Sequence, residues 1–202
     1  AALTAITLDE LFFNTSQFSV SGLPNDAKIA DVSGGLNGLP DGIPDLIIAI
    51  PTIENIAPQG AVAVLFGETI NESFVFSEVA LFTDGIVDAP VAVEVGDFNR
   101  DGQPDIVYAN SGENGIDNSV RFLNANSSLS TPIQASDIPA LLINSQADVT
   151  DLAVGEVMLV GFDVDDLLIG VSDPAQSFLR VSTFNSVFAE WTSCEIDVDD
   201  ID

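Results

Sequence analysis

The chain has 202 residues, of which 47% are hydrophobic, 32 are Asp or Glu and only 4 are Lys or Arg, so its formal net charge is −28. Such a balance excludes nucleic acid as a partner, because phosphate contacts need a basic surface, and it opposes binding to an anionic membrane. The absence of His removes the commonest general base, and the single Cys194 excludes thiolate zinc sites and an intrachain disulfide.

Residues 1–25 form the first segment, which contains apolar pieces at 3–8, 11–13 and 18–20. Their alternating pattern predicts strands. Two roles stay open: an outer strand of the chain's own sheet, or a strand exchanged with a neighbouring chain. No apolar run is long enough for a membrane-spanning helix. We also expect Ala1-Ala2 to be the end left by cleavage of a signal peptide, an inference from the calcium usage expected below.

The first repeat-like unit covers residues 26–85, with strands expected at 28–32, 46–50, 61–66 and 74–82. Between the first two strands lies Asn37-Gly-Leu-Pro-Asp-Gly-Ile-Pro-Asp45, which is rich in oxygen donors. Counted back from Asp45, a cation loop would use Asn37, Asp41 and the Ile43 carbonyl, with Leu39 in place of one ligand. Alternatively the loop is longer and Asp31 supplies the first ligand. A hairpin turn capping its own backbone is the remaining interpretation.

The second unit, residues 86–140, carries the clearest motif of the chain, Val95-Gly-Asp-Phe-Asn-Arg-Asp-Gly-Gln-Pro-Asp-Ile-Val-Tyr-Ala109. Hard cations such as Ca²⁺ take about six to eight oxygen ligands, which short Asp and Asn side chains can supply from one tight loop. A glycine at the sixth position permits the sharp bend. The motif therefore predicts a calcium loop whose ligands, at alternate positions, are Asp97, Asn99, Asp101, the Gln103 carbonyl and Asp105.

The flanks of this motif decide between types of calcium loop. An EF-hand needs a Glu at the twelfth position and a helix on each side, but that position is Tyr108, within the strand-like run Ile106-Val-Tyr108. Pro104 opposes an early helix, and a dockerin-like loop would also continue into a helix. The motif is therefore expected between two strands. Further strands of this unit are expected at 119–123 and 131–133.

The third unit, residues 141–194, keeps strand patterns at 178–184 and 187–191 but has a degenerate loop. Asp166 opens an apolar run 61 residues after Asp105, which itself follows Asp45 by 60 residues. Asp163, Asp165 and Asp166 lack the alternating spacing, so a solvated turn is favoured over a cation site. Residues 195–202 are expected to form an acidic tail or the start of another loop.

A strand–calcium loop–strand unit that recurs in this way resembles the FG-GAP or integrin-alpha-type repeat of β-propellers. Gly60-Ala-Val-Ala-Val-Leu-Phe-Gly67 is similar to the Phe-Gly element of that repeat, and Ala49-Ile-Pro51 is similar to its Gly-Ala-Pro element. The resemblance covers about residues 26–190. It implies an all-β, propeller-like array of about three four-stranded blades with calcium loops between the inner strands. Closed propellers have roughly four to eight blades, so one copy cannot close a standard ring.

We expect a non-enzymatic protein, because the chain has no nucleophile motif and no phosphate loop. The resemblance implies a calcium-stabilised extracellular or cell-surface protein that binds a protein or glycan ligand in adhesion. Two alternatives remain: a subunit that assembles into a filament or surface layer through its N-terminal strand, or a non-catalytic companion of an exported hydrolase. We expect no membrane insertion, and either a homo-oligomer or part of a longer chain. Possible glycosylation sequences begin at Asn14, Asn71 and Asn126.

Overall fold

The computed structural model describes three antiparallel sheets whose strands follow chain order. The described residues are 23–32, 40–52, 60–70, 73–82, 89–110, 118–125, 133–135, 140–143, 148–155, 165–172, 177–185 and 190–197, and they contain strands but no helix. The expected strands within 1–22 and the three glycosylation sequences begin outside these ranges. No helix in the described part is long and apolar enough to cross a membrane.

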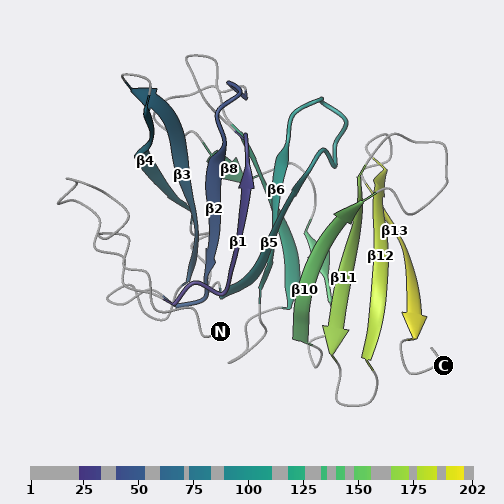
Figure 1. The fold of residues 1–202 in the computed structure, drawn as a ribbon. Coiled ribbons are helices and arrows are strands. Elements are labelled where there is room, and N and C mark those ends of the chain that lie inside the picture. The colour runs from purple at the N-terminus through teal and green to yellow at the C-terminus, as the bar shows by residue number, and fades with distance from the viewer. Residues whose placement is uncertain are drawn as a thin grey trace.

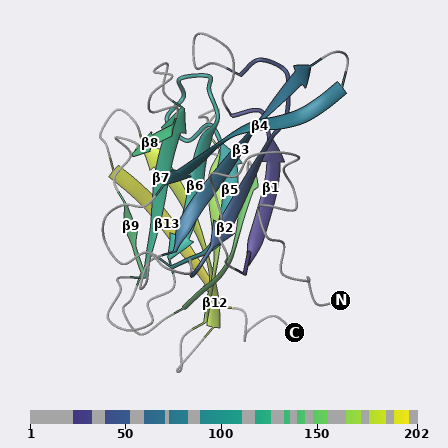
Figure 2. The same ribbon diagram turned by 90° about the vertical axis from the view of Figure 1, so that its left-hand side faces the viewer.

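The first sheet consists of β1 (Asp26–Ala30), β2 (Asp45–Ile50), β3 (Ala61–Ile70) and β4 (Ser73–Phe82). The strands expected at 46–50, 61–66 and 74–82 are present. The first strand begins and ends two residues earlier than expected. It ends before Val32, whose N–H bonds to the Asp45 carboxylate and not to a strand. A bulge between Phe66 and Gly67 interrupts the pairing of β3 with β4. Beyond it, one end of these strands bends away from the neighbouring sheet (Figure 2).

The second sheet consists of β5 (Pro90–Gly96), β6 (Asp105–Asn110), β7 (Ser119–Ala125) and β8 (Ile133–Ala135). The edge strand lies slightly after the expected 131–133. A further short strand, β9 (Leu141–Leu142), pairs with the opposite end of β7. Residues 141–142 therefore belong to the second sheet, although they were expected to begin the third unit. Their position is held by the Ile143 N–H, which donates to the Asn118 carbonyl.

The third sheet consists of β10 (Asp148–Gly155), β11 (Asp166–Ser172), β12 (Ser177–Asn185) and β13 (Glu190–Asp197). The strand expected at 178–184 is present. The last strand starts later than the expected 187–191 and continues to Asp197, so three residues of the expected acidic tail are paired with β12. The Arg180 guanidinium helps this pairing, since its Nε lies 3.6 Å from Glu195 Oε1.

The three sheets stand in a row, with the second between the other two (Figure 1). Its first strand, β5, contacts β1 and β2 on one side and β10 on the other. Both faces of β6 are consequently covered, and all six of its residues are buried. Alternate residues enter different cores: Ile106 and Tyr108 join the cluster shared with the first sheet, whereas Val107 and Ala109 join the cluster shared with the third. This row agrees with the expected blades, and a closed ring is not seen among the described residues.

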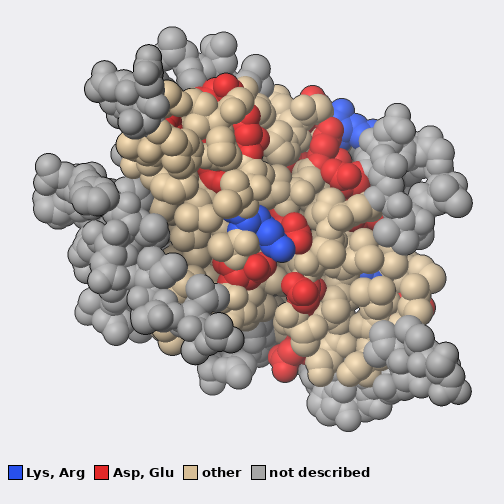
Figure 3. Space-filling model, in the orientation of Figure 1, with Lys and Arg blue, Asp and Glu red and all other residues tan. Residues whose placement is uncertain are grey.

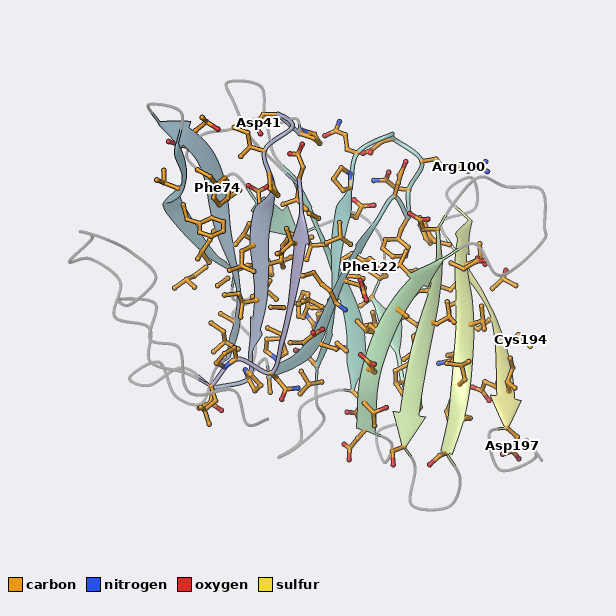
Figure 4. The ribbon with its side chains drawn as sticks, in the orientation of Figure 1. Asp41, Phe74, Arg100, Phe122, Cys194 and Asp197 are labelled. Carbon is orange, nitrogen blue, oxygen red and sulfur yellow. The ribbon has the colours of Figure 1, made fainter. Side chains whose placement is uncertain are left out.

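Phe122 occupies the core between the second and third sheets (Figure 4). Its ring centroid lies 5.4 Å from that of Phe98 and 5.1 Å from that of Trp191 on β13. Aromatic pairs at such distances contribute beyond their buried area. Phe122 therefore joins two sheets through ring contacts.

We predict that Phe122→Ala lowers the free energy of unfolding by about 3–5 kcal/mol, the usual cost of removing a large core ring. Phe74→Ala is the matched control, because the Phe74 side chain is 51% exposed at a strand end; we expect it to cost less than about 1 kcal/mol. Denaturant unfolding of both variants measures the difference. Equal losses would show that Phe122 is not a core contact between sheets.

Candidate metal centre

The second loop, residues 97–104, joins β5 to β6 and contains the predicted calcium motif. The strands flanking it are paired up to Gly96 and Asp105, so its ends are held together. Arg100 of this loop and Asp41 of the first loop, residues 31–44, lie along the same edge of the row of sheets, the upper edge in Figure 4. The fold therefore places both candidate loops on one edge of the molecule.

The side chains of the second loop accept hydrogen bonds from main-chain N–H groups further along the loop. Asp97 Oδ1 accepts from Arg100 N at 2.8 Å, and Asp97 Oδ2 accepts from Gly102 N at 2.9 Å. Asn99 Oδ1 accepts from Asp101 N at 2.8 Å, and Asp101 Oδ1 accepts from Gln103 N at 2.8 Å. Asp and Asn favour such side chain-to-main chain turns, and here they close the loop on itself.

Two residues of the second loop have left-handed backbone conformations, Arg100 with φ 65° and Gly102 with φ 79°. A Cβ added to Gly102 would meet nothing within 4 Å, so the glycine is required for its φ and not for space. Arg100 adopts the same region with a side chain and is strained by it. Main-chain strain of this kind indicates a loop whose shape is imposed by its side-chain bonds.

Asp105 begins β6 and is only 1% exposed. Its Oδ2 accepts from Phe98 N at 3.1 Å, and its Oδ1 lies 3.4 Å from the Asn99 amide nitrogen, which is also 3.1 Å from Asp101 Oδ2. Burial raises the pKa of Asp105 to about 7; the Phe98 N–H opposes the rise, and the Asp101 and Asp97 carboxylates add to it. The loop thus contains several carboxylates close together, and the N–H groups of the loop offset their negative charge only in part.

The first loop repeats this hydrogen-bond network with different residues. Asp31 Oδ2 accepts from Gly42 N at 2.6 Å, and Asp41 Oδ1 accepts from Ile43 N at 2.9 Å, as Asp97 and Asp101 do in the second loop. Gly42 has φ 85°, close to that of Gly102. Asp31 therefore takes the place of Asp97, which supports the longer of the two loop alignments. The other candidate for that place, Asn37, lies outside the described residues.

Asp45 is the counterpart of Asp105 and is also 1% exposed. Both of its oxygens accept from main-chain donors at 2.9 Å: Oδ2 from Val32 N and Oδ1 from Gly67 N on β3. A side chain on Gly67 would collide with the Pro44 carbonyl, so this glycine is needed for the loop to approach β3. Both oxygens of the Asp45 carboxylate are therefore engaged by the main chain.

The described acidic residues of the third unit make contacts within the protein, whereas a solvated turn was expected there. Asp166, which begins β11, is 2% exposed and accepts a hydrogen bond from the Thr183 hydroxyl of β12. Asp165 Oδ2 accepts from the N–H of Asp97 in the second loop at 2.8 Å. Asp163 lies outside the described residues. The residues described here therefore hold the third sheet together and attach it to the second.

The donor chemistry of the second loop fits a hard cation, although no three acidic or Cys side chains of the described residues lie close enough together to hold a metal ion as they stand. The Asn99 side-chain amide lies between Asp101 and Asp105, and its N–H groups donate to both carboxylates. They occupy the place where a bound cation would offset the negative charge. A carboxylate oxygen has more than one lone pair, so one that accepts an N–H can also bind a cation. Binding would require the loop carboxylates to draw closer together.

The surface around these loops is acidic. Acidic groups are scattered over the face seen in Figure 3, whereas basic groups occupy small areas. Lys28 Nζ lies 2.7 Å from Glu94 Oε1 and so links β1 to β5, and this hydrogen bond raises the pKa of Lys28. That lysine is thereby committed to the contact between sheets.

We predict that the stability of the metal-free protein falls between pH 5 and pH 8 in part because of Asp105. Its pKa is about 7 when folded against 3.8 as the ordinary value, so the folded state binds more protons in this range and loses stability as they dissociate. In Asp105→Asn the free energy of unfolding should decrease less over this pH range. The difference should be at most a few kcal/mol, since each unit of pKa shift corresponds to roughly 1.4 kcal/mol. Denaturant unfolding in chelator at both pH values tests this; parallel pH curves for the two proteins would refute it.

Comparison with known families gives one match. Residues 36–108 match the model of FG-GAP-like repeats. The match runs from within the first loop through β2–β5 and the second loop into β6, and it leaves the third sheet outside. Comparison with curated proteins finds no relative of similar sequence. The resemblance noted in the sequence is confirmed for this part of the chain: residues 36–108 match an FG-GAP-like repeat.

Proposed function

We propose that this chain is a non-enzymatic, calcium-stabilised β-repeat module that acts outside the cell or at its surface in adhesion or binding. The observation that carries the proposal is the recurrence of one side-chain network in two loops, Asp31–Asp41–Asp45 and Asp97–Asp101–Asp105, at the same edge of the molecule. The FG-GAP-like match spans most of this region and supports the same function.

Calcium is the cation that these residues suit best, because their donors are all oxygens and the chain has no His. Its role would be structural, since binding that requires the folded loop adds its free energy to stability. The second loop would bind through Asp97, Asn99, Asp101, Asp105 and the Gln103 carbonyl. The first would use Asp31 or Asn37, with Asp41, Asp45 and the Ile43 carbonyl.

We expect the first loop to bind more weakly. Asp45 already accepts two main-chain hydrogen bonds, and in the alignment through Asn37 a leucine stands at a ligand position. Calcium sites of extracellular modules have dissociation constants of roughly 10⁻⁴–10⁻³ M, which suits the calcium concentration outside cells.

We predict that calcium at about 100 times the dissociation constant stabilises the protein by about 2.7 kcal/mol, and that a chelator reverses the gain. Asp101→Ala should remove most of this sensitivity, because it deletes a loop carboxylate. Asp148→Ala, which removes an exposed carboxylate at the start of β10, should retain it. Thermal unfolding with calcium and with chelator measures the effect.

Calorimetry with calcium extends this test. It should resolve two sites of unequal affinity, or one site alone, with Asp101→Ala removing the tighter one. A melting curve that does not respond to calcium would refute the structural role. Two equally tight sites would show that the first loop completes its ligand set.

A subunit that associates with itself is the second candidate, and a specific surface favours it. The face of the first sheet turned away from the second carries its own apolar cluster, in which Ile48, Ala63 and Leu65 are buried, so only the margin of the cluster is exposed. Its margin includes Ile29, 75% exposed beside Leu46, and Phe74, whose ring contacts Phe76. Large exposed apolar side chains on one face favour contact with another molecule. The expected role of the N-terminal strand in this contact lies outside the described residues.

We predict that the double change Ile29→Ser with Phe74→Ser lowers self-association of the full chain. Leu23→Ser is the control, because Leu23 is 67% exposed but lies before β1. Sedimentation velocity over a range of concentrations measures the mass. Deleting residues 1–10 then distinguishes strand exchange, which predicts a folded monomer, from intrachain pairing, which predicts a destabilised domain. Association unchanged by every variant would exclude this face and the strand alike.

A further inference from the structure

The second loop receives a contact from the third sheet that does not belong to its own repeat. Asp165 Oδ2 accepts from Asp97 N at 2.8 Å, although 68 residues separate the two in the chain. The contact is reciprocal, since Asp165 N donates to the Asp97 carbonyl at 3.4 Å. One residue of the third unit thus holds both polar groups of the peptide main chain at the first position of the candidate calcium loop.

The neighbouring residues are arranged so that Asp165 can approach. A Cβ on Gly96 would lie 2.9 Å from Asp165 Oδ2 and 2.9 Å from Val154 Cγ1, closer than side-chain carbons tolerate. Val154 itself packs against the core between the second and third sheets. On the other side, Asp166 is buried and bonded to Thr183, which holds the chain at Asp165 within the third sheet.

We propose that Asp165 is a positioning residue for the second calcium loop, supplied by the third sheet; this inference rests on the proposed calcium binding. Asp165 acts through Asp97 and contributes no ligand of its own. Its negative charge orients the Asp97 peptide, and the Asp97 side chain is thereby held toward the loop interior, where it accepts from Gly102 N. Residues that orient metal ligands in this way typically change affinity by about 10–100-fold when removed.

The contact also links cation binding to the packing of the two sheets. Without a cation, Asp165 adds a further carboxylate beside the acids of the loop, and like charges oppose the contact. A cation bound by the loop would offset this repulsion and attract the Asp165 carboxylate. Coupling between two equilibria is reciprocal, so calcium should tighten the attachment of the third sheet by the factor by which Asp165 tightens calcium binding.

The test uses the full chain and three variants: Asp165→Ala, Asp165→Asn and the control Asp148→Ala, which removes a carboxylate from the same sheet. In chelator, we expect faster hydrogen exchange of the Asp97 amide in Asp165→Ala and unchanged exchange in the control. In calorimetry, we expect Asp165→Ala to weaken calcium binding about 10-fold or more. Asp165→Asn retains an acceptor, so it should keep the Asp97 amide protected while weakening calcium binding through loss of charge.

The results separate this inference from the proposed function. No calcium binding by the unaltered chain would overturn both. Calcium binding by the unaltered chain, with affinity in Asp165→Ala equal to that of Asp148→Ala, would overturn the inference alone. If Asp165→Ala does not fold, Asp165→Asn decides in the same way: weaker binding than the control supports a role for the charge, and equal binding overturns it. Slower exchange of β11 amides on calcium addition, lost in Asp165→Ala, would support the reciprocal coupling.

Discussion

A carboxylate at the first residue of a buried strand must find donors, because an ion removed from water without partners is strongly destabilising. Each of the three sheets has this arrangement: Asp45, Asp105 and Asp166 begin the second strand and are no more than 2% exposed. The preceding loop turns back so that its N–H groups reach the first two of these carboxylates. The conformation of these two loops therefore depends on the hydrogen bonds that the buried carboxylates require. The same conformation determines how the loop oxygens are placed for a cation.

The three sheets provide these donors in different ways. Asp45 bonds to two main-chain N–H groups, and Asp166 bonds to a threonine hydroxyl. Asp105 accepts from the Phe98 N–H and lies 3.4 Å from the Asn99 side-chain amide, and the Asp101 and Asp97 carboxylates lie nearby. Burial is the main cause of its raised pKa, and the nearby Asp101 and Asp97 carboxylates add to it. These nearby carboxylates are the reason why the tighter of the two proposed calcium sites is placed in the second loop.

Polar contacts between sheets accompany the apolar cores and join the loops to them. Asp26 Oδ2 accepts from Val93 N at 3.0 Å between the first and second sheets, and Asp165 meets Asp97 between the second and third. Apolar burial is nondirectional, whereas these bonds specify the position of one sheet along another. The edge carrying both loops is thus kept in register with the cores beneath it.

The sequence by itself determined the all-β class, most strands and the second loop. Alternating apolar runs have the period of strands. The oxygen ligands predicted for the second loop all come from one short segment, residues 97–105, so their spacing in the sequence is enough to predict the loop. Only the tertiary structure shows that Asp31 accepts from Gly42 N as Asp97 accepts from Gly102 N, and that Leu141 pairs with β7. It also decided that Asp165 serves a loop 68 residues away. These contacts depend on which strands become neighbours, and that is determined by the packing of whole sheets. It therefore cannot be predicted from the spacing of residues along the chain.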